Sequence, residues 1–312
     1  MKVIFVVGTT ASGKSKKIYD LCLDLNSQNK KSAIVNCDSI QAYQSLIIGS
    51  AAPLDEDKKK VDHFLYNYIE KGKELTAGEY RRNFFECLEK IHHIYENVFV
   101  VGGTGFYFQS IEKGMYPVSA VNQTLITELE LQLETATGAE KLYTELLQKD
   151  PLAAQKISKN DHYRIARAVE MMRTHGKSVS QVVQEFETQR QPFPFPLKKW
   201  GLFFEKEALL QRIQLRTEIM IGAGLLDEVR SRIDEGFIDW APLNSVGYRE
   251  AKAFILSGKA ENEKNLSELK RLISQSTSQL AKKQRTWFRR DSEIKWFNAA
   301  TTISKDLNQD LF

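Results

Sequence analysis

The stretch with the clearest chemistry is Gly8-Thr9-Thr10-Ala11-Ser12-Gly13-Lys14-Ser15. Two spaced glycines followed by a lysine and a hydroxyl residue form the pattern of a P-loop, in which successive backbone N–H groups bind phosphate oxygens. Lys14 adds a positive charge for the outer phosphate oxygens, and the Ser15 hydroxyl can ligate Mg²⁺. The stretch therefore predicts a site for two linked phosphates, although it does not say which molecule carries them.

The residues around this loop predict the elements that position it. An apolar run at 3–7 predicts a buried strand before the loop, and apolar residues at helical spacing over 16–23 predict a helix after it. Further apolar runs predict strands at 33–37, 98–101 and 200–204. The sequence thus predicts an α/β fold of the P-loop NTPase type, with a mostly parallel sheet flanked by helices.

The segment Asp38-Ser39-Ile40-Gln41 follows the second predicted strand, at the sheet edge where α/β proteins bind ligands. The Asp38 carboxylate can act as a general base, and the polar groups of Ser39 and Gln41 can read the edge of a nucleobase. An aspartate at this position is equally typical of a helix N-cap. Both interpretations of Asp38 stay open.

The third predicted strand, 98–101, runs into Gly102-Gly103-Thr104. Many P-loop NTPases carry a metal-binding aspartate at this point. Here the glycines are expected to let a ligand approach the backbone, and the Thr104 hydroxyl can both donate and accept a hydrogen bond. A plain turn is the alternative.

The region between the third and fourth strands is predicted to be helical throughout, and a proline-rich linker at 192–196 closes it. We therefore expect an all-helical insertion domain, 117–191, that divides the core domain into 1–116 and 192–312. The predicted helices of the insertion are 123–148, 151–157, 161–174 and 178–186.

Basic side chains gather at three places in the sequence. Arg212 and Arg216 share one face of a predicted helix and can close over an anion, and the sequence leaves open which of them reaches it. The predicted helix at 264–290 is strongly basic and contains Trp287, a combination that favours nucleic acid over a membrane. The predicted helix at 161–174 offers a further face for a phosphate backbone.

Composition narrows the class of protein. The 312 residues carry a net charge of only +4, which does not by itself indicate a polyanion partner. Three widely spaced cysteines without a CxxC pair argue against a zinc site or a disulfide framework and favour a cytoplasmic location. No apolar run approaches the roughly 18 residues of a membrane span, so we expect no membrane association.

Taken together, these motifs resemble the bacterial-type tRNA dimethylallyltransferases. The resemblance spans nearly the whole chain and rests on an ordered set of blocks that is far more specific than the P-loop alone. The blocks are 8–15, 38–43, 101–107, Asp161 with 164–170, Arg216 with 224–229, 246–250 and 284–289.

The resemblance implies transfer of a dimethylallyl group from dimethylallyl diphosphate to N6 of the adenosine 3′ to the anticodon. Asp38 is implied as the base, and Thr104 as a hydrogen-bonding group between the amine and the bridging oxygen. The loop 8–15, Arg216 and a Mg²⁺ ion on Ser15 are implied to bind the departing diphosphate.

The implied macromolecular partner is the anticodon stem-loop of tRNA, bound by a monomeric enzyme. The residues predicted to contact tRNA are Asp38, Ser39, Ile40, Gln41, Thr104, Tyr163, Arg164, Ile165, Ala166, Arg167, Asn244, Ser245, Val246, Gly247, Tyr248, Arg249, Arg285, Trp287 and Arg289.

The chain departs from the family pattern at three places. Thr9 replaces a usual proline, 62–64 replaces a stretch with paired histidines, and Ile126 stands where an arginine is expected.

Two other functions remain alternatives. A P-loop nucleotide or small-molecule kinase would use the same loop for ATP, with Asp38 activating a hydroxyl. A nucleic-acid-binding NTPase is disfavoured because no Asn-Lys-x-Asp signature is present.

Overall fold

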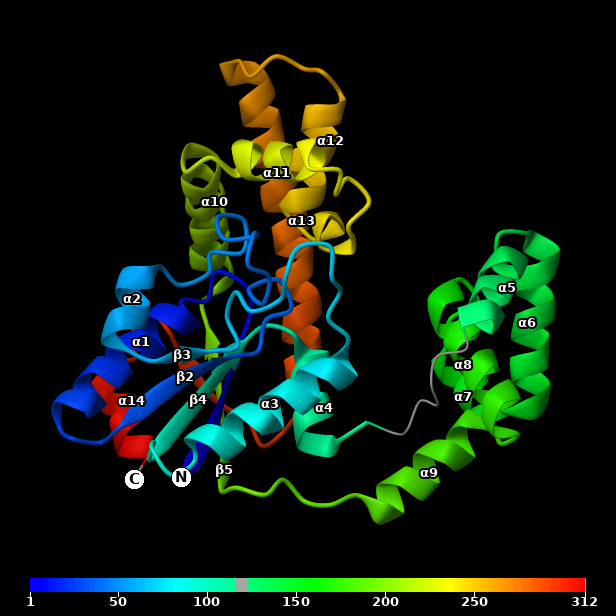
Figure 1. Cartoon of the computed structure of the whole chain (residues 1–312), viewed down its shortest axis with the longest axis horizontal. Coiled ribbons are helices and arrows are strands. Elements are labelled where there is room, and N and C mark those ends of the chain that lie inside the picture. Colours follow the sequence, from blue (N-terminus) through cyan, green and yellow to red (C-terminus); the bar gives the residue numbers. More distant parts are fainter. Residues whose placement is uncertain (116–122, 312) are drawn as a thin grey trace. The chain divides into compact units, whose positions relative to one another are not determined.

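The computed structural model describes residues 1–115 and 123–311 (Figure 1). The chain forms two compact units, of which the first contains Met1–Glu112 and Phe193–Phe312 and the second contains Lys113–Pro192. The predicted insertion, 117–191, falls within the second unit, and its first residues lie outside the described part of the chain.

A six-stranded sheet forms the framework of the first unit (Figure 1). Its strands are β1 (Lys2–Gly8), β2 (Ser32–Asn36), β3 (His63–Phe64), β4 (Asn97–Gly102), β5 (Leu197–Phe203) and β6 (Lys295–Asn298). The order is β3-β2-β4-β1-β5-β6, and every neighbouring pair is parallel. The predicted α/β fold is confirmed, and β3 and β6 are additional to the strands that the sequence predicts.

The side chains of central strand β1 alternate between two cores, because successive residues of a strand face opposite sides of the sheet. Val3 and Phe5 pack in one core with Tyr80 and Phe84 of α3 (Ala77–Ile91). Ile4 and Val6 pack in the other core with α1 (Lys14–Ser27) and α14 (Ser304–Leu311). Helices therefore cover both faces, as a parallel sheet requires.

A group of helices in the first unit packs around a third core that includes Tyr43 and Leu46 from the loop after β2. The longest of them, α13 (Glu263–Phe288), buries Leu269, Ile273 and Thr277 along one stripe at a spacing of four residues. The remaining helices of this unit are α2 (Asp55–Lys60), α4 (Gly105–Lys113), α10 (Lys206–Gly222), α11 (Leu225–Asp234), η1 (Ala241–Asn244) and α12 (Tyr248–Leu256).

The second unit contains only helices among its described residues: α5 (Gln123–Leu133), α6 (Ala136–Lys149), α7 (Pro151–Lys156), α8 (His162–His175) and α9 (Val179–Gln189). The predicted single helix at 123–148 is wrong. The chain starts a new helix at α6, because the Thr135 side chain accepts a hydrogen bond from the Gly138 N–H at 3.1 Å. Within 1–115 and 123–311, no helix combines the length and apolar character needed to cross a membrane.

Candidate active site

The predicted P-loop lies between β1 and α1, and several of its backbone amide groups are free. Ala11 and Gly13 have positive φ angles of 60° and 77°, which turn the backbone before the helix begins. Among the residues that the structure describes, the amide groups of Gly13, Lys14 and Ser15 have no hydrogen-bond partner. Free N–H groups at a helix N-terminus favour an anion.

The first half of the loop is tightly packed. A Cβ atom at Gly8 would lie 2.5 Å from the Leu202 carbonyl oxygen and 2.8 Å from Ser12 Oγ, so glycine is required. The buried hydroxyls of Thr9 and Ser12 have no hydrogen-bond partner within the described residues. Buried polar groups are almost always paired, and such exceptions are typical of a site that a ligand completes.

Lys14 and Arg216 place two positive charges beside the loop. The Lys14 ammonium donates to the Thr9 carbonyl at 3.2 Å. Burial lowers its pKa to about 8, the Asp38 carboxylate opposes this shift, and the neighbouring Arg216 adds to it. Burial also lowers the pKa of Arg216, and Asp38 again acts in the opposite direction. The three charged groups are therefore close enough to influence one another.

The two arginines of α10 contact the loop in different ways. Arg216 donates to Thr10 Oγ1 at 3.3 Å and to the Ser50 carbonyl at 3.2 Å. Arg212 is exposed, donates to the Ala11 carbonyl at 2.9 Å and stacks on an aromatic ring. Both arginines that the sequence singled out thus lie at the loop, and Arg216 is the more enclosed.

Asp38 uses only one of its carboxylate oxygens within the protein. Oδ1 accepts hydrogen bonds from the Ile40 N–H at 3.0 Å and the Gln41 N–H at 3.4 Å. No α-helix begins there, because the next helix is α2, so the arrangement is a local turn instead of a helix N-cap. Oδ2 has no hydrogen-bond partner in 1–115 and 123–311 and can accept a proton.

Thr104 lies beside this aspartate across the ends of two strands. Its Oγ1 accepts from the Ser39 N–H at 3.0 Å and donates to Ser39 Oγ at 3.4 Å. The close approach depends on Gly102, where a Cβ atom would lie 1.9 Å from the Cys37 carbonyl oxygen. The structure therefore brings Asp38, Ser39 and Thr104 together at the carboxyl edge of the sheet.

Gln284 of α13 joins the two halves of the site. It is the first residue of the block 284–289, and the sequence predicted no role for it. Its Oε1 accepts from the Thr10 N–H at 2.8 Å, and its Nε2 donates to the Gly103 carbonyl at 3.0 Å. A Cβ atom at Gly103 would lie 2.4 Å from Gln284, and one at Gly105 would lie 2.2 Å from Trp287. Both glycines make room for protein side chains, and for Gly103 this differs from the expectation that it lets a ligand approach the backbone.

The residues predicted to contact tRNA have mixed surroundings in the first unit. Gln41 donates to the carbonyls of Ser50 and Ala51, both at 3.0 Å, and Tyr248 is buried. Direct contact of the Tyr248 side chain with RNA is therefore not supported. The exposed residues of this set are Asn244, Arg249, Arg285 and Arg289, and those partly buried are Asp38, Ser39, Ile40, Gln41, Thr104, Ser245, Val246 and Trp287.

In the second unit the predicted contact residues all belong to α8. Tyr163 is 74% exposed and Arg164 is also exposed, whereas Ile165 and Ala166 are buried in the core of that unit. Arg167 pairs with a buried glutamate of the same helix. Only the exposed members of this set offer side chains to a partner, and their RNA contacts stay predictions.

Ser15, the predicted Mg²⁺ ligand, lines a pocket of about 260 Å³ together with Tyr19, Gln41, His63 and Tyr66. Its hydroxyl is exposed at the start of α1. A single protein oxygen beside a phosphate site fits Mg²⁺, which keeps several waters and takes its other ligands from phosphates.

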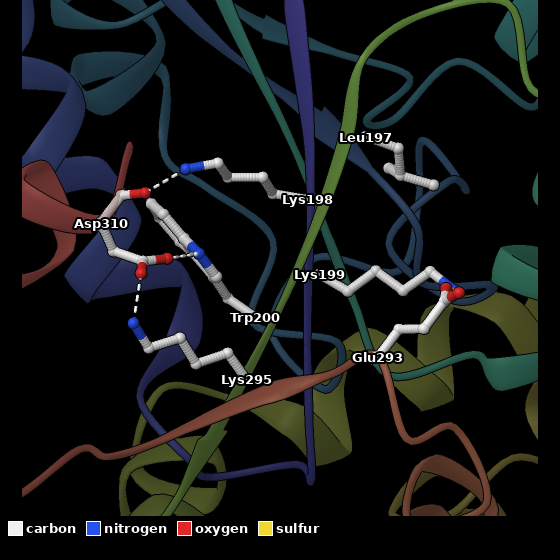
Figure 2. A pocket seen from close by; sticks show the side chains of 7 residues that line it. All are labelled: Leu197, Lys198, Lys199, Trp200, Glu293, Lys295 and Asp310. Atoms are coloured by element: carbon white, nitrogen blue, oxygen red, sulfur yellow. Dashed lines mark hydrogen bonds and ion pairs between the residues drawn. The ribbon is translucent and has the colours of Figure 1, made fainter. Parts of the chain in front are cut away.

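A group of carboxylates elsewhere in the first unit could also hold a metal, but a lysine occupies its centre. Glu112, Asp291 and Glu293 accept from Lys199 Nζ at 2.5, 2.9 and 2.6 Å. Figure 2 shows Lys199 reaching Glu293, with Asp310 contacting its own partners nearby. Lys199, Glu293 and Asp310 line a pocket at the amino end of β5, at the sheet edge opposite to the P-loop.

The fold and the loop first define the class: an α/β protein of the P-loop type, with the loop at the carboxyl edge of a parallel sheet. Comparison with known proteins then identifies the family. A family model described as IPP transferase matches residues 41–291. A tRNA dimethylallyltransferase of Bdellovibrio bacteriovorus is 48% identical over 97% of this chain and 95% of its own length. The chain belongs to the IPP transferase family, and the resemblance seen in its motifs is confirmed.

Solved structures agree with this assignment. The full-length tRNA isopentenylpyrophosphate transferase from Bacillus halodurans is 27% identical, with a TM-score of 0.67 over 99% of this chain and 94% of that one. A eukaryotic dimethylallyltransferase acting on tRNA is 22% identical, with a TM-score of 0.79 over 99% of this chain and 80% of that one, and supports the fold alone. These comparisons do not favour the kinase alternative.

Proposed function

We propose that this protein modifies tRNA by transferring a dimethylallyl group from dimethylallyl diphosphate to N6 of the adenosine 3′ to the anticodon. The names of the most similar proteins support tRNA prenyl transfer. The observation that carries the proposal is the juxtaposition of a free carboxylate oxygen at Asp38 with the cations Lys14 and Arg216. Burial lowers the pKa of both cations, and the Asp38 carboxylate opposes this shift.

The proposed reaction is a displacement at the allylic carbon. The adenine amine is a weak nucleophile, because its lone pair is delocalised into the ring. As the new carbon–nitrogen bond forms, the amine becomes acidic, and Asp38 Oδ2 takes its proton. The allylic carbon–oxygen bond breaks, and its electron pair leaves with the diphosphate.

The loop stabilises the charge that develops on the departing diphosphate. The amides of Gly13, Lys14 and Ser15 and the charges of Lys14 and Arg216 supply preorganised positive potential. When bound, Mg²⁺ would add further charge neutralisation, with Ser15 as its protein ligand. Thr104 is proposed to hydrogen-bond between the amine and the bridging oxygen.

Access to the amine requires an unpaired base, because the reacting atom must enter a pocket. An anticodon loop supplies such a base. The exposed Arg285 and Arg289 are proposed to bind backbone phosphates near the site, with Tyr163 and Arg164 as further contacts from the second unit. We also propose a monomer acting in the cytoplasm, which suits the three free cysteines.

The direct test offers the protein two donors. One reaction contains unmodified tRNA with dimethylallyl diphosphate labelled in its five-carbon group, and a parallel reaction contains tRNA with ATP labelled at the γ-phosphate. We expect label in tRNA only from the first donor, on the adenosine 3′ to the anticodon. Transfer of label to tRNA from ATP, with none from dimethylallyl diphosphate, would overturn the proposal.

A further inference from the structure

Glu228, in the first turn of α11, receives four hydrogen bonds on one carboxylate. Its Oε2 accepts from the amides of Ile47 and Ile48, both at 2.8 Å. Its Oε1 accepts from the Gly49 amide at 3.1 Å and from the Tyr248 hydroxyl at 2.7 Å. Charge-assisted hydrogen bonds are stronger than neutral ones, so this carboxylate fixes three successive residues of the loop after β2.

Tyr248 completes the same clamp from α12. A Cβ atom at Gly49 would lie 2.4 Å from the Tyr248 ring, so the ring packs directly on the loop backbone. The Tyr248 hydroxyl also accepts from the Ser50 N–H at 3.1 Å. The ring is 1% exposed, and a buried hydroxyl with both functions satisfied defines one position for the loop.

The fixed loop presents the Ser50 carbonyl to the active site. That oxygen accepts from Arg216 at 3.2 Å and from Gln41 at 3.0 Å, while the other terminal nitrogen of Arg216 contacts Thr10 of the P-loop. Among the described residues, Arg216 has no carboxylate within ion-pair distance. Neutral oxygens therefore orient its guanidinium and leave its charge available to an anion.

We propose that Glu228 is a positioning residue for Arg216. It holds the loop 47–50 so that the Ser50 carbonyl aims the guanidinium at the bound diphosphate. The inference rests on the proposed function, in which the P-loop binds that diphosphate. It also gives a role to Glu228 of the block 224–229 and to Tyr248 of the block 246–250.

The test is a double-mutant cycle read out by binding of inorganic pyrophosphate, measured by calorimetry. Glu228→Gln cannot accept from all three amides, so we expect it to weaken pyrophosphate binding about tenfold. In an Arg216→Ala background the same change should have almost no further effect, because the two residues act in series. Wild-type affinity in Glu228→Gln, or independent effects that multiply in the double variant, would overturn the inference.

Two further variants keep the test decisive. Asp227→Asn removes a neighbouring carboxylate that pairs with Arg230 of its own helix, and it should bind pyrophosphate like the wild type. If Glu228→Gln does not fold, Tyr248→Phe removes one hydroxyl from the clamp, retains the ring, and should show the same dependence on Arg216. An unchanged affinity in Tyr248→Phe would then overturn the inference.

Failure of the proposed function would look different. A wild-type protein that binds pyrophosphate but transfers no dimethylallyl group would contradict the proposed reaction, and a coupled cycle would still support the positioning role. A wild-type protein that transfers the group normally, with Glu228→Gln equally active and equally tight for pyrophosphate, would contradict the positioning role alone.

Discussion

The lowered pKa of Lys14 should make the proposed affinity of the loop for diphosphate depend on pH in a range where an ordinary lysine would not titrate. Lys14 titrates near pH 8 in the free protein, because burial disfavours its charged form. The Lys14 side chain attracts an anion only while it is protonated. Its contribution to diphosphate affinity is therefore complete below about pH 7 and is lost as pH rises through about 8. Its charged fraction falls about tenfold between about pH 7 and pH 9.

The assay is calorimetric titration with pyrophosphate, without Mg²⁺, from about pH 6 to about pH 10. Pyrophosphate also titrates in this range, so the quantity of interest is the ratio of the wild-type affinity to that of Lys14→Gln. We expect this ratio to stay constant below about pH 7 and to fall about tenfold by about pH 9. A ratio that remains constant to about pH 10 would refute the reasoning.

A second variant tests the cause of the shift. The Asp38 carboxylate raises the pKa of Lys14, so Asp38→Asn should lower that pKa further and move the loss of affinity to lower pH. A shift of the curve to higher pH would mean that the two groups do not interact as the structure indicates.

Three other predictions concern Thr104, the arginines of α13 and Gln284. Thr104→Val should lower kcat roughly 100-fold with little change in tRNA affinity, because a hydrogen bond at the reacting atoms is lost; weaker tRNA binding at an unchanged rate would make Thr104 a recognition residue. Arg285→Ala with Arg289→Ala should reduce the slope of log affinity against log salt by roughly 1 to 2 in a tRNA-binding titration. Gln284→Ala should lower the free energy of unfolding by about 1 to 3 kcal/mol in urea, because Thr10 and Gly103 lose their partner.

Each of these variants has a matched control in the chain. Thr104→Ser retains the hydroxyl and should retain most activity. Lys59→Ala with Lys60→Ala removes the same charge from α2 and should leave the salt slope nearly unchanged. Gln279→Ala, on an exposed position of α13, should change the unfolding free energy by less than about 0.5 kcal/mol. If a variant and its control have equal effects, the predicted role of that residue is wrong.

The sequence predicted the centre of the fold better than its edges. Strands β1, β2 and β4 are largely buried and give continuous apolar runs, which is the signal of a parallel sheet covered on both faces. Strand β5 gives a shorter apolar run, which begins after Lys198 and Lys199. Edge strands β3 and β6 have two and four residues and no fully buried positions, so they lack this signal. The boundary between α5 and α6 was missed because a single threonine cap interrupts an otherwise helical pattern.

Some residues of the candidate site could likewise be predicted from the sequence, and others could not. The P-loop and Asp38 were predictable because a local order of strand, loop and polar residues carries their chemistry. Gln284 and Glu228 were not, because the loop residues that they contact lie between 179 and 274 residues away along the chain. A glutamine on a basic helix has no local feature that marks it as a bridge. Only the packing of α13 and α11 against the loops shows their contacts.

The central claim is that Asp38 removes a proton from the adenine amine while the P-loop holds the departing diphosphate. The most direct measurement is the single-turnover rate of Asp38→Asn with labelled dimethylallyl diphosphate and unmodified tRNA, both saturating. The asparagine retains the shape and one oxygen acceptor for the turn but cannot take the proton. We expect the transfer rate of Asp38→Asn to be about 100- to 10,000-fold lower than that of the wild type, with tRNA affinity within about twofold of the wild type. A variant that transfers the group at close to the wild-type rate would contradict it.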